Sequence, residues 1–562
     1  MRFLESFLLI PILCTGVSFA DKISAPLEDV LSVLALTRAD IGIAKDYLPD
    51  PDRLSVTRRL LRDPLSADGW LTSLAGSLQE GSNDVPLAIA RGLLDSSQGE
   101  ALGPIRVDPT GLETLLLDSG QRIRTLVPIF AGRPLIGLVH PDSTFSASAL
   151  DDAVAEGRRV PVLELLDVAV RLVTAADQVS AAFGGPVSYE TVVGRVTIGT
   201  EGDDRYSVPH ALIFDPGGND VYIDVAGVSS ESVPVSVVID LAGDDRYLGR
   251  AGTGRSGVGI LVDRSGNDAY DASNQSQASG LGGIGVLVDL DGDDRYTTGV
   301  GGQGFGLYGV GVLVDRSGDD TYSADLLAQG SAGPGGVGLL VDHSGDDTYH
   351  AGGAHHDFRE GGAHTQSMSQ GYSLGLQTEV SAGAGLLFDL EGRDRYEVSY
   401  FGQGASHWAG TGALYDGHGD DVYVARRYSQ GCGTHLSAGI LVDVSGDDVY
   451  SMWGVGQGCG HDLAVGVLAD RSGHDEYVIM WLGQGAGSAN GTGLLIDSSG
   501  DDIYRADRAD TQGFGSPARG FDSVGILLDL AGVDRFRNPF ARLLVKSGQT
   551  GARYDVSGGQ VP

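Results

Sequence analysis

Lysine, cysteine and long apolar runs are scarce in this 562-residue chain, and each scarcity excludes a class of protein. Lysine occurs only at Lys22, Lys45 and Lys546, so the Gly-rich region has none for Schiff-base chemistry or for binding a nucleotide phosphate. One of the three cysteines lies near the N-terminus and the others are Cys432 and Cys459, which excludes a disulfide-dense scaffold. No segment has 18 consecutive apolar residues, so we expect no transmembrane helix.

Positive charge is also scarce, because 38 Lys and Arg residues face 75 Asp and Glu residues and leave a formal charge of −37. A surface of that sign repels nucleic acid and anionic lipid, so we expect neither as a partner. Apolar residues still make up 41% of the chain, enough for a packed core. The 87 glycines follow no three-residue period, which excludes collagen.

The first 20 residues have the features of a secretory signal peptide. Arg2 gives a weakly positive start, residues 7–17 are apolar, and Ser18-Phe19-Ala20 fits a small-residue cleavage site. We therefore expect cleavage after Ala20 and an exported protein that is periplasmic, attached to the cell surface or released.

The abundant feature is one repeated motif, Asp-x-x-Gly-x-Asp-x-Tyr, as at 315–322 and 443–450. It occurs in twelve complete copies and one truncated copy that begins at Gly202, with a spacing that settles near 27 residues. Each copy follows a short apolar run, such as 258–262, that is typical of a strand buried in a parallel stack. The first aspartates of the complete copies are Asp215, Asp240, Asp263, Asp289, Asp315, Asp342, Asp389, Asp416, Asp443, Asp470, Asp497 and Asp529.

A period near 27 residues fits a three-sided parallel β-helix and is too short for the blade of a β-propeller. We therefore predict a mostly β fold, a right-handed parallel β-helix (solenoid) of about 13 coils, with the hand taken from the usual chirality of parallel crossovers. We expect this solenoid over 186–538. A mainly α-helical domain over 21–185 is expected to cap the first coil, and the segment 539–562 is expected to cover the last one.

Stacked coils would place equivalent aspartates about 4.8 Å apart. At that distance two carboxylates repel by roughly 3–4 kcal/mol at an effective dielectric constant of about 20. The Gly-x-Asp-x-Tyr segment resembles half of the calcium-binding repeats-in-toxin nonapeptide, although the period is longer and the doubled glycine occurs only at 217–218. The resemblance implies Ca²⁺ between successive coils, and the alternative is that each aspartate only closes an Asx turn. The aspartates assigned to Ca²⁺ are Asp289, Asp294, Asp315, Asp320, Asp342, Asp347, Asp389, Asp394, Asp416, Asp421, Asp443, Asp448, Asp470, Asp475, Asp497 and Asp502.

Two further columns follow from the repeat. A glutamine stands seven residues after most repeat tyrosines, as at Gln303 and Gln430, and we interpret this column as a ladder of stacked side-chain amides. Cys432 and Cys459 each follow such a glutamine by two residues, at positions that are otherwise small or apolar. We therefore predict buried thiols and no disulfide.

The repeat is interrupted between Asp342 and Asp389, where the spacing rises to 47 residues and the segment 350–364 contains four histidines. The coils that follow carry aromatic, Arg and His side chains, which stack on sugar rings and pair with carboxylate or sulfate groups. Secreted proteins of similar architecture bind or cleave polysaccharides. The residues assigned to glycan binding are Tyr400, His407, Trp408, Arg426, His435, Trp453, His461 and Trp481.

The leading hypothesis is an exported, calcium-supported solenoid that binds an extended polysaccharide on its lateral face and also cleaves it if it is a lyase or hydrolase. For cleavage we assign His356 or His364 as the base, Arg427 as the charge neutraliser and Tyr428 as the acid. The rival hypothesis is a non-catalytic structural or adhesive protein of the cell envelope. A metal hydrolase built on the histidine-rich segment ranks last.

Overall fold

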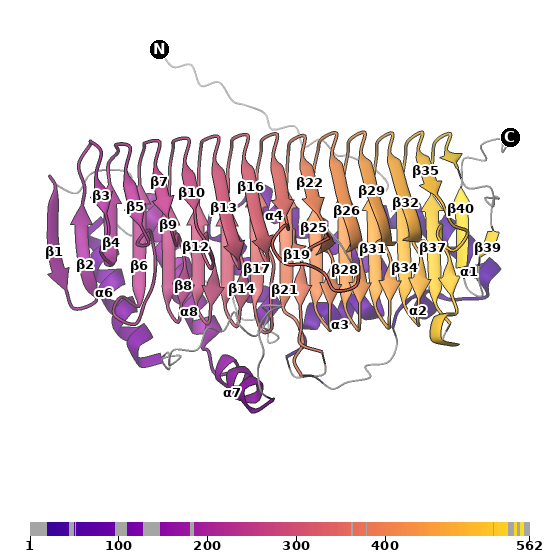
Figure 1. The fold of residues 1–562 in the computed structure, drawn as a ribbon, viewed down its shortest axis with the longest axis horizontal. Coiled ribbons are helices and arrows are strands. Elements are labelled where there is room, and N and C mark those ends of the chain that lie inside the picture. The colour runs from indigo at the N-terminus through magenta and orange to yellow at the C-terminus, as the bar shows by residue number, and fades with distance from the viewer. Residues whose placement is uncertain are drawn as a thin grey trace, which may run out of the picture.

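The computed structural model describes residues 19–43, 50, 52–95, 109–126, 147–179, 185–360, 364–377, 379–520, 522–537, 545–547 and 551–555. The chain forms a parallel β-solenoid whose coils stack along one axis, with helices laid along one side (Figure 1). The predicted signal segment, 1–20, lies outside the described residues except for its last two, which begin helix α1. Among the helices described, none is long and apolar enough to cross a bilayer.

The strands form three sheets, numbered 1 to 3 here. Sheet 1 has the order β1 (Val187–Thr191), β2 (Gly194–Ile198), β4 (His210–Asp215), β6 (Val235–Asp240), β9 (Val258–Val262), β12 (Ile284–Val288), β15 (Val310–Val314), β17 (Val337–Asp342), β21 (Ala384–Asp389), β25 (Thr411–Tyr415), β28 (Ala438–Asp443), β31 (Val465–Asp470), β34 (Thr492–Asp497), β37 (Val524–Asp529), β40 (Gly551–Asp555) and β39 (Val545–Ser547). Sheet 2 has the main path β3 (Arg205–Tyr206), β5 (Val221–Ile223), β7 (Arg246–Leu248), β10 (Ala269–Asp271), β13 (Arg295–Val300), β16 (Thr321–Leu326), β18 (Thr348–Ala351), β22 (Arg395–Val398), β26 (Val422–Ser429), β29 (Val449–Gly456), β32 (Glu476–Gly483), β35 (Ile503–Ala506) and β38 (Arg535–Phe536), with β19 (Gln366–Ser369) and β23 (Tyr400–Gly402) beside it. Sheet 3 consists of short strands in two runs, β8 (Gly254–Arg255), β11 (Gly280–Leu281) and β14 (Gly306–Leu307), then β20 (Ser373–Leu374), β24 (Ser406–His407), β27 (Gly433–Thr434), β30 (Gly460–His461), β33 (Gly487–Ser488) and β36 (Gly515–Ser516).

Equivalent residues of successive repeats pair in parallel register. Val312 of β15 lies opposite Val286 of β12, and Tyr296 of β13 lies opposite both Tyr270 and Tyr322. Like residues therefore form columns along the axis, and the prediction of a mostly β, parallel β-solenoid with a helical N-terminal region is confirmed.

Sheet 1 is buried on both faces, which explains why its strands are almost continuously apolar. Leu261 of β9 packs inward with the repeat tyrosines. Val258, Ile260 and Val262 of the same strand face outward and belong to the same core as the helix residue Leu172. The outer face of sheet 1 thus needs the helices as a cover.

The described helices lie along sheet 1. We had predicted that they would cap the first coil, and this position was wrong. They are α1 (Phe19–Leu34), α2 (Arg38–Ile41), α3 (Ser55–Arg62), α4 (Ala67–Glu80), α5 (Val85–Leu94), α6 (Pro109–Leu126), α7 (Ala147–Gly157) and α8 (Val162–Gln178). Helix α6 contacts β6 near one end of the rod, α5 contacts β17 in the middle, and α1 contacts β40 at the other end (Figure 1). The apolar outer face of sheet 1 draws the helices along the rod, because burying it removes more apolar surface than covering one coil.

Two antiparallel hairpins close the ends of sheet 1. Strand β1 pairs antiparallel with β2 before the first coil, and β39 pairs antiparallel with β40 after the last one. Strand β40 in turn pairs in parallel with β37. The described part of the C-terminal segment therefore extends sheet 1 beyond the last repeat, and each hairpin gives the sheet a short edge.

The glycine and the glutamine of the repeat both lie where neighbouring coils meet. Gly318 has φ +147°, and a side chain there would collide with the carbonyl of Gly292 in the preceding coil, so this position requires glycine. The glutamine column is not an amide ladder. Gln403 donates from Nε2 to the backbone oxygens of Tyr396 (3.0 Å) and Val424 (3.1 Å), so each glutamine joins two coils through their main chains.

Candidate functional site

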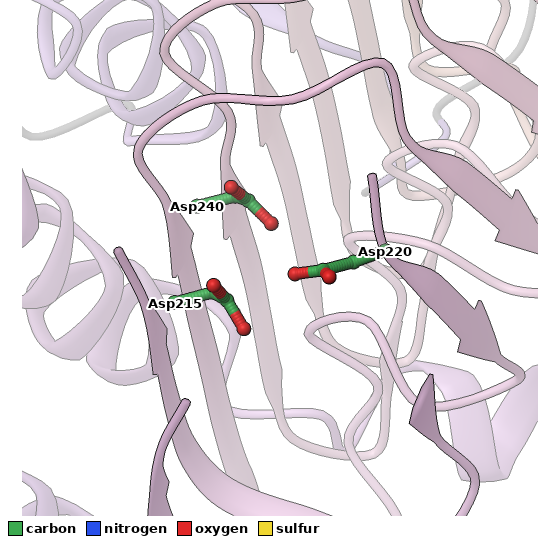
Figure 2. A group of neighbouring side chains, drawn as sticks. All are labelled: Asp215, Asp220 and Asp240. Carbon is green, nitrogen blue, oxygen red and sulfur yellow. The ribbon is translucent and has the colours of Figure 1, made fainter. Parts of the chain in front are cut away.

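The first candidate site is a ladder of buried aspartates at the corner between sheets 1 and 2. The first Asp of each repeat ends or directly follows a strand of sheet 1, and the second Asp directly precedes a strand of sheet 2. Figure 2 shows Asp215, Asp220 and Asp240 converging from these two sides. We call the two columns together the aspartate ladder.

The tyrosine column supports the first aspartates through its hydroxyl groups. The rings of successive tyrosines stack with centroids 4.6–5.0 Å apart, from Tyr206 through to Phe536. Most of the hydroxyls reach the first Asp of the next coil, as where the Tyr423 hydroxyl donates to Asp443 Oδ2 at 2.7 Å, whereas the Tyr504 hydroxyl donates to Asp497 of its own repeat at 3.0 Å. The repeat tyrosine therefore joins neighbouring coils by a hydrogen bond as well as by packing in the core.

The second aspartates hold one another through the backbone. Oδ1 of Asp448 accepts the N–H of Asp421 at 2.7 Å, and Oδ1 of Asp475 accepts the N–H of Asp448 at 2.8 Å. The other oxygen, Oδ2, of these three residues is buried and has no hydrogen-bond partner within the described chain. The first Asp of the same coils, such as Asp443, has a buried Oδ1 that also has no hydrogen-bond partner among the described residues.

These unpartnered oxygens face other carboxyl groups. One oxygen each from Asp215, Asp220 and Asp240 lie within 4.8 Å of one another, and the same grouping recurs up the rod. Burial, with the neighbouring Asp443 second, raises the pKa of Asp421 to about 8. Three carboxylates in a dry interior cannot all be charged unless a positive charge lies among them.

The donor set fits a hard cation. Every group offers carboxylate oxygens from two coils, and Ca²⁺ prefers such ligands at distances that place them up to about 5 Å apart. A proton shared between the two carboxyl groups of one repeat, such as Asp416 and Asp421, would satisfy the same oxygens. Asx turns also exist, as where Asp315 Oδ1 accepts the N–H of Ser317 at 3.3 Å, but they use only one oxygen of the ladder.

The second candidate site lies on the outer face of sheet 2. Its residues are Arg426 and Arg427 of β26, Trp453 of β29, Trp481 of β32 and Arg508 beyond β35, which we call the arginine–tryptophan patch. Arg427 Cζ lies 4.7 Å from the ring centroid of Trp453 and 4.8 Å from that of Trp481. Both indole rings are half-buried, and their centroids are 5.7 Å apart.

Strand register explains how this patch forms. Arg427, Gly454 and Trp481 occupy the same position in three successive strands. Because residue 454 is glycine, no side chain stands between the guanidinium of Arg427 and the indole two coils away. Arg426 lies over Trp453 from the same side, with its Cζ 4.6 Å from the ring centroid.

The insertion between β18 and β19 brings Glu360 to this patch. Glu360 Oε2 accepts from Arg426 Nη2 at 2.9 Å, and Oε1 accepts from Arg427 Nη1 at 3.2 Å. His364 Nε2 lies 3.7 Å from Oε2. Burial raises the pKa of Glu360, but hydrogen bonds from Arg426 and Tyr400 and the charges of Arg426 and Arg427 lower it below its usual value, so the group is a carboxylate.

The residues assigned to cleavage are brought together only in part. His364 and Arg427 meet at Glu360, and the Tyr428 ring stacks on Phe401 with centroids 5.0 Å apart. His356 is exposed and forms a backbone bridge to Thr365.

Of the remaining residues assigned to glycan binding, Tyr400 borders the patch beside Glu360 and Arg427, and the others lie elsewhere. Tyr400 is fully buried, and Trp408 is 9% exposed and packs with Ala409 and Leu436, so neither ring offers a face to a sugar. His407, His435 and His461 line successive coils of sheet 3, with the first two ring centroids 4.9 Å apart.

Burial lowers the pKa of His407 to about 3 and that of His461 to about 4, so both rings are neutral. His435 Nδ1 lies 3.0 Å from Asp462 Oδ2. The histidine column is therefore separate from the arginine–tryptophan patch and mostly enclosed.

Sequence reasoning missed Glu360 and Arg508 at the patch. Glu360 stands 66 residues before Arg426, inside an insertion without repeat spacing, so no periodicity relates the two. Arg508 follows a repeat tyrosine at nearly the same offset as Trp453 and Trp481, which could have indicated its position.

Both cysteines are free and buried, as predicted. A comparison of this chain with protein-family models, with curated proteins and with solved structures found no significant match.

Proposed function

We propose that this protein is an exported solenoid that binds an extended polysaccharide along the outer face of sheet 2. The observation that carries the proposal is the arginine–tryptophan patch. In a chain with a formal charge of −37, three arginines and two tryptophans gather on neighbouring coils of one face. Met480, which is 41% exposed, extends the apolar part of that surface.

The chemistry of the patch suits a long glycan more than a small ligand. Its residues follow the rod axis over several coils, and a polymer can contact successive coils at once. Indole edges and aliphatic arginine stems pack on sugar rings, and guanidinium groups pair with carboxylate or sulfate substituents. A uniform scaffold has no need for this local group, which is why binding is favoured over a purely structural or adhesive role.

A glycan array probed with wild-type protein and with a Trp453→Ala/Trp481→Ala variant tests this function. We expect the double variant to bind about 5- to 150-fold more weakly, since each aromatic contact is worth about 0.5–1.5 kcal/mol and about 1.4 kcal/mol corresponds to tenfold in affinity. Trp70→Ala is the matched control, because Trp70 is a half-buried indole near Arg59 in the helical layer. Equal binding by all three proteins would contradict the proposal, and new reducing or unsaturated ends in the same assay would reveal cleavage.

We also propose that Ca²⁺ neutralises the aspartate ladder. The support is the set of buried carboxylate oxygens, such as Asp394 Oδ2 and Asp416 Oδ1, that lack a donor among the described residues. When bound, the ion would supply positive charge between coils and so tie each coil to the next. Its effect should therefore appear as a higher melting temperature of the rod.

A further inference from the structure

The geometry of Glu360 points to the ligand class of the arginine–tryptophan patch: we infer that the patch binds a carboxylate-bearing polysaccharide, a polyuronate, and that Glu360 occupies the carboxylate position in the free protein. This inference rests on the proposed function and adds the chemical identity of the ligand to it.

The Glu360 carboxylate has a charged donor on each of its two oxygens. Arg426 donates to Oε2 from Nε (3.1 Å) and Nη2 (2.9 Å), and Arg427 donates to Oε1 from Nη1 (3.2 Å). Two guanidinium groups thus donate charged hydrogen bonds to both oxygens of one carboxylate, Arg426 to Oε2 and Arg427 to Oε1, and such charge-assisted bonds favour a carboxylate ligand. His364, at 3.7 Å, closes the remaining side.

Groups other than Glu360 hold Arg426 and Arg427 in place. The side chain of Arg427 is only 13% exposed and lies against the indoles of both Trp453 and Trp481. Arg426 rests on Trp453. The two guanidinium groups therefore keep their orientation when one carboxylate replaces another between them, as a ligand site requires.

Glu360 reaches the site from an insertion outside the regular coils of the solenoid. It belongs to the insertion, whereas Arg426 and Arg427 belong to a strand of the rod two coils further along. Its side chain is 18% exposed, so solvent and solutes reach the carboxylate. An external uronate carboxylate offers the same two oxygens, and its sugar ring would lie beside the half-buried indoles.

The test compares polygalacturonate with its fully methyl-esterified form, which has the same backbone without carboxylates. We expect wild-type protein to bind only the acid form. Glu360→Gln should bind it about tenfold more tightly, because the fraction of protein with an open site rises. Arg426→Gln/Arg427→Gln should lose binding. Glu397→Gln, which removes a carboxylate that pairs with Arg395 on the same sheet, is the matched control and should match wild type.

Each outcome separates the inference from the function on which it rests. Equal binding of acid and ester, no gain with Glu360→Gln, or a preference for dextran sulfate would overturn the carboxylate assignment while leaving glycan binding intact. No binding of any polysaccharide by any variant would overturn both. If Glu360→Gln lowers the melting temperature and alters the fold, the acid and ester comparison on wild-type protein still decides.

Discussion

At the scale of single residues, the repeat tyrosine joins two coils through its hydroxyl as well as its ring. The chain carries Phe536 at the last position of this column, which indicated from sequence that packing alone mattered. Elsewhere the hydroxyl donates to a buried carboxylate, a bond that no spacing rule indicates because its partner lies about 20 residues further along. The positions of Asp, Gly and Tyr were predictable from the period, whereas their hydrogen bonds were not.

Tyr423→Phe tests this bond. Removing the hydroxyl leaves Asp443 Oδ2 without its donor, and an unsatisfied buried acceptor costs about 1–3 kcal/mol of unfolding free energy. Urea denaturation measures the change. Tyr308→Phe is the control, because the Tyr308 hydroxyl is buried but has no hydrogen-bond partner among the described residues. A loss in both variants of the same size would show that the hydroxyl bond is not the cause.

At the scale of elements, the helical layer is the largest departure from expectation. Helices over 21–185 were predictable from composition and periodicity, but their position was not, because we judged only the exposed coil end to need cover. A signal was present in the strands. Runs such as 258–262 are apolar at both alternating positions, so a second apolar layer had to lie outside sheet 1.

Leu172→Ala tests the contact between helix α8 and sheet 1. Leu172 is fully buried in the core that α8 shares with the outer face of β9, and such truncations cost about 2–5 kcal/mol. Leu163→Ala, at a half-buried position of the same helix, should cost less than half as much. Urea unfolding followed by helical circular dichroism measures both, and equal losses would show that α8 is held by other contacts.

At the scale of the whole molecule, the aspartate ladder links stability to pH and to cations. Burial raises the pKa of Asp421 and of Asp443 to about 8, and that of Asp394 to about 9. Because these values lie above the unfolded value near 4, protonation stabilises the fold fully below about pH 4. That contribution declines as the pH rises through 8 and 9, unless a cation replaces the protons.

The period made the ladder predictable in outline, since stacking in register must align like residues. It could not predict that the two aspartate columns meet, because this depends on how each corner folds. Asp416 and Asp421 lie five residues apart and come within hydrogen-bonding reach only because the turn between sheets 1 and 2 reverses the chain. The same holds for the arginine–tryptophan patch. The period predicted that its side chains lie on neighbouring coils, but it could not predict that the insertion places Glu360 beside them.

Thermal melting in chelator and in excess Ca²⁺, at pH 5 and at pH 8, tests the ladder most directly. In chelator we predict a melting temperature at pH 8 that is lower than at pH 5 by about 10 °C or more, as buried carboxylates lose their protons. Ca²⁺ should restore most of that loss at pH 8 and have little effect at pH 5. Melting temperatures that change with neither pH nor Ca²⁺ would contradict the account, because the buried carboxylates would then need no positive charge among them.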